Sequence, residues 1–229
     1  MSNKKILKRI MICIIIVIST LILCIIGLLI KQSRMDKKIN NDFSNIYSNE
    51  KYKKVVAVYG IETIKQEVSC GYACIEMLSN WLGKDITEQI LLEENNGKIS
   101  TAMGNGFFKE MNKQFPEYET ERYINLTNTE LIGKIYDSLE NGMPVPIEFA
   151  AIYQESDTQV WTLHFALVTA LDIPNDSITV SNPYGYEETY TIKEFLNSTR
   201  YDSYENMEFY FKLGFLSRIF NKNTIYIIK

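Results

Sequence analysis

The chain of 229 residues is poor in histidine, with His164 alone, and it contains four cysteines. Zinc sites draw on clusters of histidine, cysteine or carboxylate ligands, so one histidine without clustered cysteines argues against a metal centre. Cys13 and Cys24 lie inside an apolar run, and Cys70 and Cys74 occupy successive turns of one expected helix, a poor geometry for a disulfide. We expect no metal, no cofactor and no disulfide framework, and any cysteine–histidine chemistry has one available base.

Charge is absent from residues 10–30, which are mostly Ile, Leu, Val, Met and Cys. A helix of this length spans about 31 Å, enough to cross the hydrocarbon core of a bilayer. A cleaved signal peptide would have a shorter apolar run that ends in small residues, whereas this run ends in leucine and isoleucine before Lys31. Leu23 before Cys24 disfavours a lipoprotein site. We predict a retained transmembrane helix at residues 10–30, preceded by a basic tail at residues 1–9.

Residues 31–54 are rich in Asn, Ser and Lys and lack a sustained apolar period, which is typical of a linker beside a membrane. We expect the folded domain to occupy residues 55–229. Four basic residues precede the apolar run and four follow it closely, so the positive-inside count does not decide the orientation. The short N-terminal tail favours a cytoplasmic N-terminus and an extracytoplasmic domain.

Charge is divided unevenly along the chain, with a net +8 in residues 1–54 and a net −12 in the remainder. An acidic domain repels polyanions, which argues against nucleic acid as a partner and favours a basic peptide. The basic stretch beside the apolar run suits lipid headgroups. An acidic surface that serves solubility alone explains the charge of the domain equally well.

Helical periodicity marks the first half of the domain, and short β-branched or aromatic runs mark the second half. The predicted helices cover residues 70–82, 87–95, 107–115 and 129–140. The predicted strands cover residues 145–151, 159–172, 177–181, 188–191, 209–212 and 224–228. Helices followed by strands predict an α+β domain with an antiparallel sheet.

Cys70 stands at the start of the first predicted helix of the domain. It follows Ser69, which belongs to a residue type that favours N-caps, and the apolar period ends at Gly83. The free N–H groups and the positive end of the helix dipole stabilise a thiolate in the first turn, so we expect Cys70 to be the reactive cysteine. Cys74 lies one turn deeper and gains less. Packing alone would also explain both cysteines.

His164 lies in an apolar run that reads as a strand, and a turn at residues 173–176 sends the chain back toward Asn182. A catalytic histidine needs a third group that orients its ring, and Asn182 is placed for that role. Gln66 precedes Cys70 by four residues and is a candidate to donate its amide to an oxyanion. The alternatives are a buried core histidine, a turn-forming asparagine and a surface glutamine.

Five short motifs occur in order between residues 60 and 197. They are Gln66 before Cys70-Gly71-Tyr72-Ala73-Cys74, then Asn80-Trp81-Leu82-Gly83, Gly142-Met143-Pro144-Val145, His164-Phe165-Ala166-Leu167-Val168 and Asn182-Pro183-Tyr184-Gly185. Together they resemble the papain-like cysteine peptidases that process the double-glycine leaders of bacteriocins, and their stand-alone relatives. The resemblance implies a papain-like cysteine peptidase fold, with N-terminal helices packed on a C-terminal antiparallel sheet.

The same resemblance implies that Cys70 is the nucleophile, His164 the base, Asn182 the orienting residue and Gln66 the oxyanion donor. Asn182 stands where the family usually has Asp, although papain-like relatives also use Asn. We therefore expect a membrane-anchored cysteine peptidase that cleaves peptide or other amide bonds without a cofactor. The alternative is a catalytically silent papain-like domain that binds a peptide or a membrane-protein partner.

Aromatic residues are concentrated near the C-terminus, and two interpretations fit them. They are Tyr201, Tyr204, Phe209, Tyr210, Phe211, Phe215 and Phe220. They form either an apolar docking surface or the packed side chains of core strands.

Overall fold

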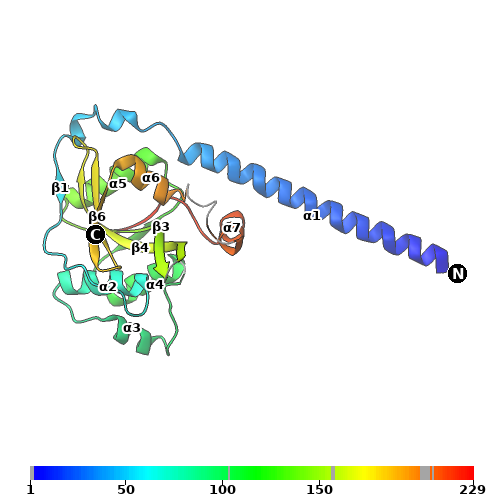
Figure 1. The fold of residues 1–229 in the computed structure, drawn as a ribbon, viewed down its shortest axis with the longest axis horizontal. Helices are drawn as coiled ribbons and strands as arrows, with labels where there is room; N and C mark the ends of the chain where they lie inside the picture. Colours follow the sequence, from blue (N-terminus) through cyan, green and yellow to red (C-terminus); the bar gives the residue numbers. More distant parts are fainter. Residues whose placement is uncertain (1–2, 103, 156–157, 202–206, 208) are drawn as a thin grey trace. The chain divides into compact units, whose positions relative to one another are not determined.

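The computed structural model describes residues 3–102, 104–155, 158–201, 207 and 209–229. It divides into two compact units, Met1–Lys38 and Ile39–Lys229. Helix α1 (Asn3–Ile39) accounts for the first unit (Figure 1). Its side chains from residue 5 to residue 30 are all exposed. Its length and composition are sufficient for a membrane span.

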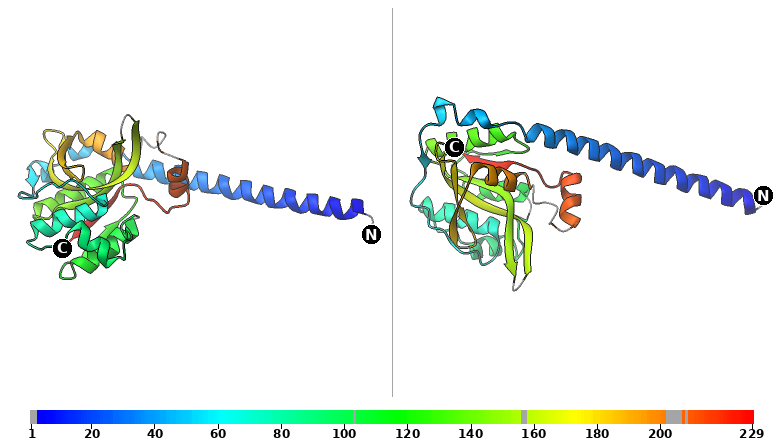
Figure 2. Two further views of the ribbon diagram at one scale, coloured as in Figure 1. Left: turned by 60° about the horizontal axis from the view of Figure 1, so that its bottom comes forward. Right: turned by 45° about the horizontal axis from the view of Figure 1, so that its top comes forward.

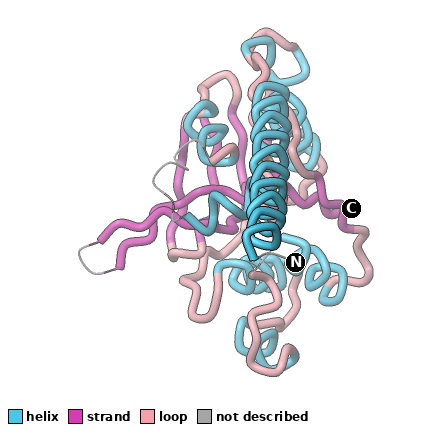
Figure 3. Tube along the Cα trace, turned by 90° about the vertical axis from the view of Figure 1, so that its right-hand side faces the viewer, coloured by secondary structure: helices cyan, strands magenta, loops and turns pink. Residues whose placement is uncertain are grey.

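The second unit is built on one antiparallel sheet. The strands are β1 (Val56–Ala57), β2 (Thr120–Tyr123), β3 (Val145–Glu155), β4 (Thr158–Asp172), β5 (Ser177–Asn182), β6 (Tyr186–Tyr190) and β7 (Thr224–Ile228). They run in the order β2-β7-β3-β4-β5-β6, and β1 pairs with β4. The C-terminal strand β7 therefore lies inside the sheet, between β2 and β3. Strands β3 and β4 continue beyond the helices as a projecting hairpin (Figure 3).

Helices cover both faces of this sheet (Figures 1 and 2). Helices α2 (Cys70–Trp81), α3 (Glu88–Glu94) and α4 (Gly104–Gln114) share one core cluster with the β4 residues Phe165 and Leu167. Helices α5 (Asn128–Glu140) and α6 (Ile192–Thr199) share the other core cluster with Ala166 and Val168. This division follows from the strand period, because successive side chains of β4 point to opposite faces. The predicted α+β class with an antiparallel sheet is confirmed.

The compact unit begins at Ile39, ahead of the expected domain start at residue 55. Two short 3₁₀ helices, η1 (Ser44–Ile46) and η2 (Glu50–Tyr52), follow α1. Ile39, Ile46 and Tyr52 are buried in this unit. Asn41 accepts from the backbone N–H of Thr129 at 3.3 Å, which fastens the segment to the start of α5.

The prediction of a strand at residues 209–212 is wrong, because this segment begins helix α7 (Phe209–Leu216). The run is apolar at nearly every position, so periodicity does not separate helix from strand, and packing decides. Phe211 and Phe215, one helical turn apart, are both buried in a cluster with Tyr201. Tyr204 of the expected aromatic group lies outside the described residues. Helix α6 was not predicted, although Thr191 and Glu194 form a capping box at its start.

Candidate active site

Cys70 is the first residue of α2, as the sequence predicts. The hydroxyl of Ser69 accepts from the backbone N–H of Tyr72 at 3.2 Å and so caps the helix. The next residue is necessarily small, because a Cβ on Gly71 would lie 2.5 Å from Oγ1 of Thr101. The loop that carries Thr101 therefore packs directly on the first turn of α2, beside the Cys70 thiol.

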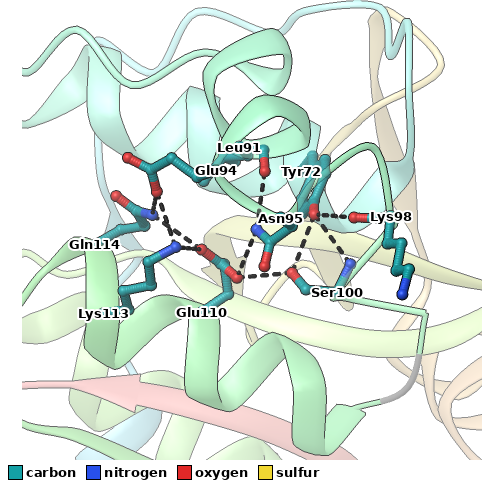
Figure 4. Close-up of polar contacts among 9 residues, drawn as sticks. All are labelled: Tyr72, Leu91, Glu94, Asn95, Lys98, Ser100, Glu110, Lys113 and Gln114. Carbon is teal, nitrogen blue, oxygen red and sulfur yellow. Dashed lines mark hydrogen bonds and ion pairs between the residues drawn. The ribbon is translucent and has the colours of Figure 1, made fainter.

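A polar network fixes this loop between α3 and α4 (Figure 4). The hydroxyl of Tyr72 donates to the carbonyl of Lys98 at 2.9 Å, and Ser100 donates to the buried carboxylate of Glu110 at 2.7 Å. The same carboxylate accepts from the side chain of Asn95 at 3.2 Å. Helices α2, α3 and α4 are thus joined through the loop that covers the start of the Cys70 helix.

Glu88 holds the segment that leads into Cys70. Its carboxylate accepts three successive backbone N–H groups, from Glu67 at 2.7 Å, Val68 at 2.9 Å and Ser69 at 2.8 Å. Glu88 is buried, so these hydrogen bonds form away from bulk water and order the loop strongly. The carboxylate also places a negative charge near Cys70.

His164 projects from β4 and bonds to Asn182 at the end of β5. Nε2 of His164 lies 2.8 Å from Oδ1 of Asn182. Oδ1 also accepts the backbone N–H of Tyr184 at 3.0 Å, and Nδ2 of Asn182 donates to Glu188 at 2.6 Å. These partners fix the orientation of the amide, so Nε2 of the imidazole is the donor and Nδ1 is left as the basic nitrogen.

Aromatic rings enclose the imidazole. The ring of Tyr184 stacks on His164 with centroids 4.2 Å apart, and Phe149 lies 5.7 Å away. This burial lowers the pKa of His164 to about 4, and the bond to Asn182 acts weakly in the opposite direction.

Cys70 and His164 line one cavity of about 80 Å³, together with Phe165, Tyr201 and the carboxylate residue Glu148. Burial raises the pKa of the Cys70 thiol to about 11, while the backbone N–H groups of Phe165, Gly71 and Cys70 itself lower it. The helix terminus therefore acts in the direction that the sequence predicts, but burial outweighs it. The resting pair is a neutral thiol and a neutral imidazole.

Gln66 lies in a neighbouring groove of about 630 Å³, which it lines with Tyr184 and Tyr186. Its backbone N–H donates to the carbonyl of Pro183 at 2.7 Å, so the segment before Cys70 is fastened to the turn after Asn182. Its side-chain Oε1 is buried and has no hydrogen-bond partner among the described residues. Tyr184 forms the wall between this groove and the imidazole.

Comparison with known protein families matches residues 32–210 to the model of the Peptidase_C39 like family. The chain belongs to this family. Membership confirms the resemblance found in the motifs and the papain-like fold class. The chain is also similar to the solved double glycine motif protease from an AMS/PCAT transporter in complex with the leader peptide, at 12% identity and a TM-score of 0.43. That match covers 78% of this chain and 93% of the solved chain. No curated protein matches the sequence.

The site of this C39-like domain contains residues that the sequence analysis did not single out. The sequence distance between Glu88 and Cys70 matches no recognised motif. The contact of Glu88 with the loop before Cys70 depends on how α3 packs beside α2. Tyr184 was within a recognised motif, but only the fold reveals that its ring stacks on His164. Glu188 pairs with Asn182 across the β5–β6 hairpin, where Val180 is its register partner.

Proposed function

We propose that this C39-like protein is a membrane-anchored cysteine peptidase that cleaves peptide or other amide bonds. The observation that carries the proposal is the bond between His164 and Asn182 beside a cavity that His164 shares with Cys70. A buried packing histidine would not need a fixed amide partner and a cavity shared with a thiol at the start of a helix.

In the proposed mechanism, Nδ1 of His164 takes the proton of the Cys70 thiol as the sulfur attacks the substrate carbonyl. The backbone N–H of Cys70 and the side-chain amide of Gln66 donate to the oxyanion. His164 then protonates the leaving amine, and a thioester remains on Cys70. Water, deprotonated by His164, adds to the thioester, and the thiol leaves with the proton as the acid product is released.

The opposite pKa shifts of Cys70 and His164 determine when the proton moves in the first step. Because burial raises the pKa of Cys70 and lowers that of His164, a separated thiolate–imidazolium pair is unfavourable in the free protein. Proton transfer therefore accompanies attack instead of preceding it. Asn182 remains neutral, so it orients the imidazole without stabilising the imidazolium as a carboxylate would.

The proposed organisation places residues 10–30 in the lipid bilayer, after a basic tail at residues 1–9. Residues 31–38 connect the span to the compact unit, which begins at Ile39 and contains the proposed peptidase domain at residues 55–229. We propose that the domain lies on the extracytoplasmic side of the bilayer. The proposed substrate is a peptide or protein, with basic sequences favoured by the net charge of −12 after residue 54. Nucleic acid is not a proposed partner.

The test uses the full chain in detergent or vesicles, labelled with iodoacetamide across a range of pH and mapped by peptide. Faster labelling at Cys70 than at the buried Cys74, lost in a His164→Ala variant, supports a histidine-assisted nucleophile. Peptide-library hydrolysis with Cys70→Ala as the matched control then tests cleavage. Peptide binding without cleavage, unchanged in Cys70→Ala, would identify the silent binding domain instead.

A further inference from the structure

Exposed apolar side chains gather on the outer face of α7 and on the turn that follows it. Phe209 is 72% exposed, Tyr210 57%, Leu213 48% and Ile219 53%. Phe209 and Leu213 lie one helical turn apart, so they share one face, and Tyr210 lies beside that face. We call these four residues the α7 patch.

Packing of the opposite face holds this helix on the sheet. Phe211 and Phe215 are buried in a cluster with Tyr201, and Leu163 of β4 packs against the same cluster. A Cβ on Gly214 would lie 2.2 Å from the ring of Phe220, so the chain is tightly packed on this side. The α7 patch is therefore not required to seat the helix, and its exposure needs another explanation.

Ordinary surface helices of this domain present charge to solvent. Helix α5, for example, exposes Glu130, Asp137 and Glu140 opposite its buried face. Helix α7 instead has apolar residues on both faces. No acidic residue occurs from residue 209 to residue 222, a segment with three basic residues, although residues 55–229 carry a net charge of −12. Aromatic and aliphatic groups within a basic segment are the composition of a surface that binds an anionic lipid interface.

The proposed anchor confines the domain to the neighbourhood of a bilayer. Only residues 31–38 separate the uncharged run from the compact unit, and they are helical in α1. Eight helical residues extend about 12 Å. A bilayer surface is therefore permanently available to the domain at high effective concentration, whereas any soluble partner must be captured from solution.

We propose that the α7 patch is a second membrane contact, which places Phe209, Tyr210 and Leu213 among the headgroups of an anionic leaflet. This inference rests on the proposed anchoring. It gives the peptidase domain a fixed face toward the lipid in addition to its covalent tether. The cavity that contains Cys70 borders the inner face of the same cluster through Tyr201 and Phe220, so the lipid contact also sets how the site faces the membrane.

The experiment measures how deeply a tryptophan at position 209 enters the bilayer. The full chain keeps Trp81 and Trp161, because Trp161 packs against the cluster that seats α7, and Phe209→Trp is added as the reporter. The emission and quenching of the parent chain are subtracted as background. The matched control is Tyr59→Trp, since Tyr59 is 84% exposed and lies in the segment after β1. Both proteins are reconstituted in phosphatidylcholine vesicles with or without phosphatidylglycerol, using lipids brominated along the acyl chain as quenchers. Circular dichroism and the alkylation rate of Cys70 report that both fold alike.

We expect blue-shifted emission at position 209 and at least threefold stronger bromine quenching than at position 59, reduced without phosphatidylglycerol. Adding Tyr210→Ser and Leu213→Ser should remove that difference while Phe211 and Phe215 keep the helix seated. Equal quenching at the two positions would overturn the proposal. Blue-shifted emission without quenching, dependent on protein density, would also overturn it and would assign the patch to a second copy of the chain.

A separate readout distinguishes failure of the anchor from failure of the patch. Vesicles are washed with sodium carbonate at high pH, which removes proteins held only at the surface. Protein that washes off but was quenched at position 209 before the wash has lost the anchor and kept the patch contact. Protein that resists the wash but shows no quenching at position 209 has kept the anchor, and the patch proposal fails.

Discussion

The imidazole of His164 lies 2.8 Å from Oδ1 of Asn182, and the same oxygen accepts the backbone N–H of Tyr184. One amide oxygen therefore fixes both the tautomer of the ring and the turn that places an aromatic side chain over it. Nδ2 of Asn182 is held by Glu188 on β6. The arrangement orients the imidazole through a neutral amide.

The first prediction concerns Asn182→Asp, which would replace the neutral partner by a carboxylate. A negative charge beside Nε2 favours the imidazolium, so the pKa of His164 rises from about 4. Because the proposed base must be neutral, the acidic limb of kcat/KM moves to higher pH. Asn182→Ala removes the orienting bond and should lower kcat about 10²-fold, within the usual range for general acid–base groups. An unchanged acidic limb in Asn182→Asp would contradict the assigned contact.

The second prediction concerns the negative charge of Glu88. It raises the pKa of Cys70, in addition to the larger effect of burial. Glu88→Gln removes the charge, so the alkylation rate of Cys70 should rise at lower pH than in the parent chain. Glu88→Ala removes the acceptor of three N–H groups and should destabilise the protein by about 3 kcal/mol or more.

Iodoacetamide titration and thermal unfolding separate these two effects. Glu121→Gln is a matched control, because Glu121 is a carboxylate on β2 that pairs with Lys229, whereas Glu88 accepts from the loop before Cys70. If Glu88→Gln loses stability but leaves the titration midpoint of Cys70 unchanged, its charge has no electrostatic effect on the thiol.

The third prediction concerns the ring that stacks on His164. Tyr184→Ala exposes the imidazole to water, and because burial is the main cause of its lowered pKa, the pKa should rise toward 6.5. Tyr184→Phe keeps the ring and should leave the pKa nearly unchanged. His164 is the sole histidine of the chain, so its ring protons titrate without overlap in an NMR experiment. Equal pKa values in the Ala and Phe variants would show that Tyr184 does not shield the base.

Much of this architecture is encoded locally and was predictable. The Ser69 cap marks the start of α2, and the turn at residues 173–176 brings Asn182 back beside His164. Contacts between elements were not predictable in the same way. Glu88 reaches the loop before Cys70 only because α3 packs beside α2.

The protonation of Cys70 could not be predicted from the sequence for the same reason, because it depends on contacts between distant elements. Its place in the first helical turn predicts a stabilised thiolate, and the local N–H groups do act in that direction. Burial outweighs them, and burial depends on side chains from distant segments, including Phe165, Tyr201 and Phe220. Segment 209–216 was mispredicted for a related reason, since a nearly uniform apolar run takes its conformation from what it packs against.

The fourth prediction links His164 to stability. Its pKa is about 4 in the folded protein and about 6.5 in the unfolded chain, so at neutral pH both states are uncharged and the group has no effect. As pH falls below 6.5, the unfolded chain binds a proton that the folded protein does not, and folding loses stability until about pH 4. A difference of this size corresponds to about 3 kcal/mol. Carboxylates titrate in the same window, so the measurement is the difference between the parent chain and His164→Gln in urea unfolding at pH 7 and pH 4.5. The parent should lose more stability than the variant, and equal losses would mean that His164 is accessible to protons in the folded state.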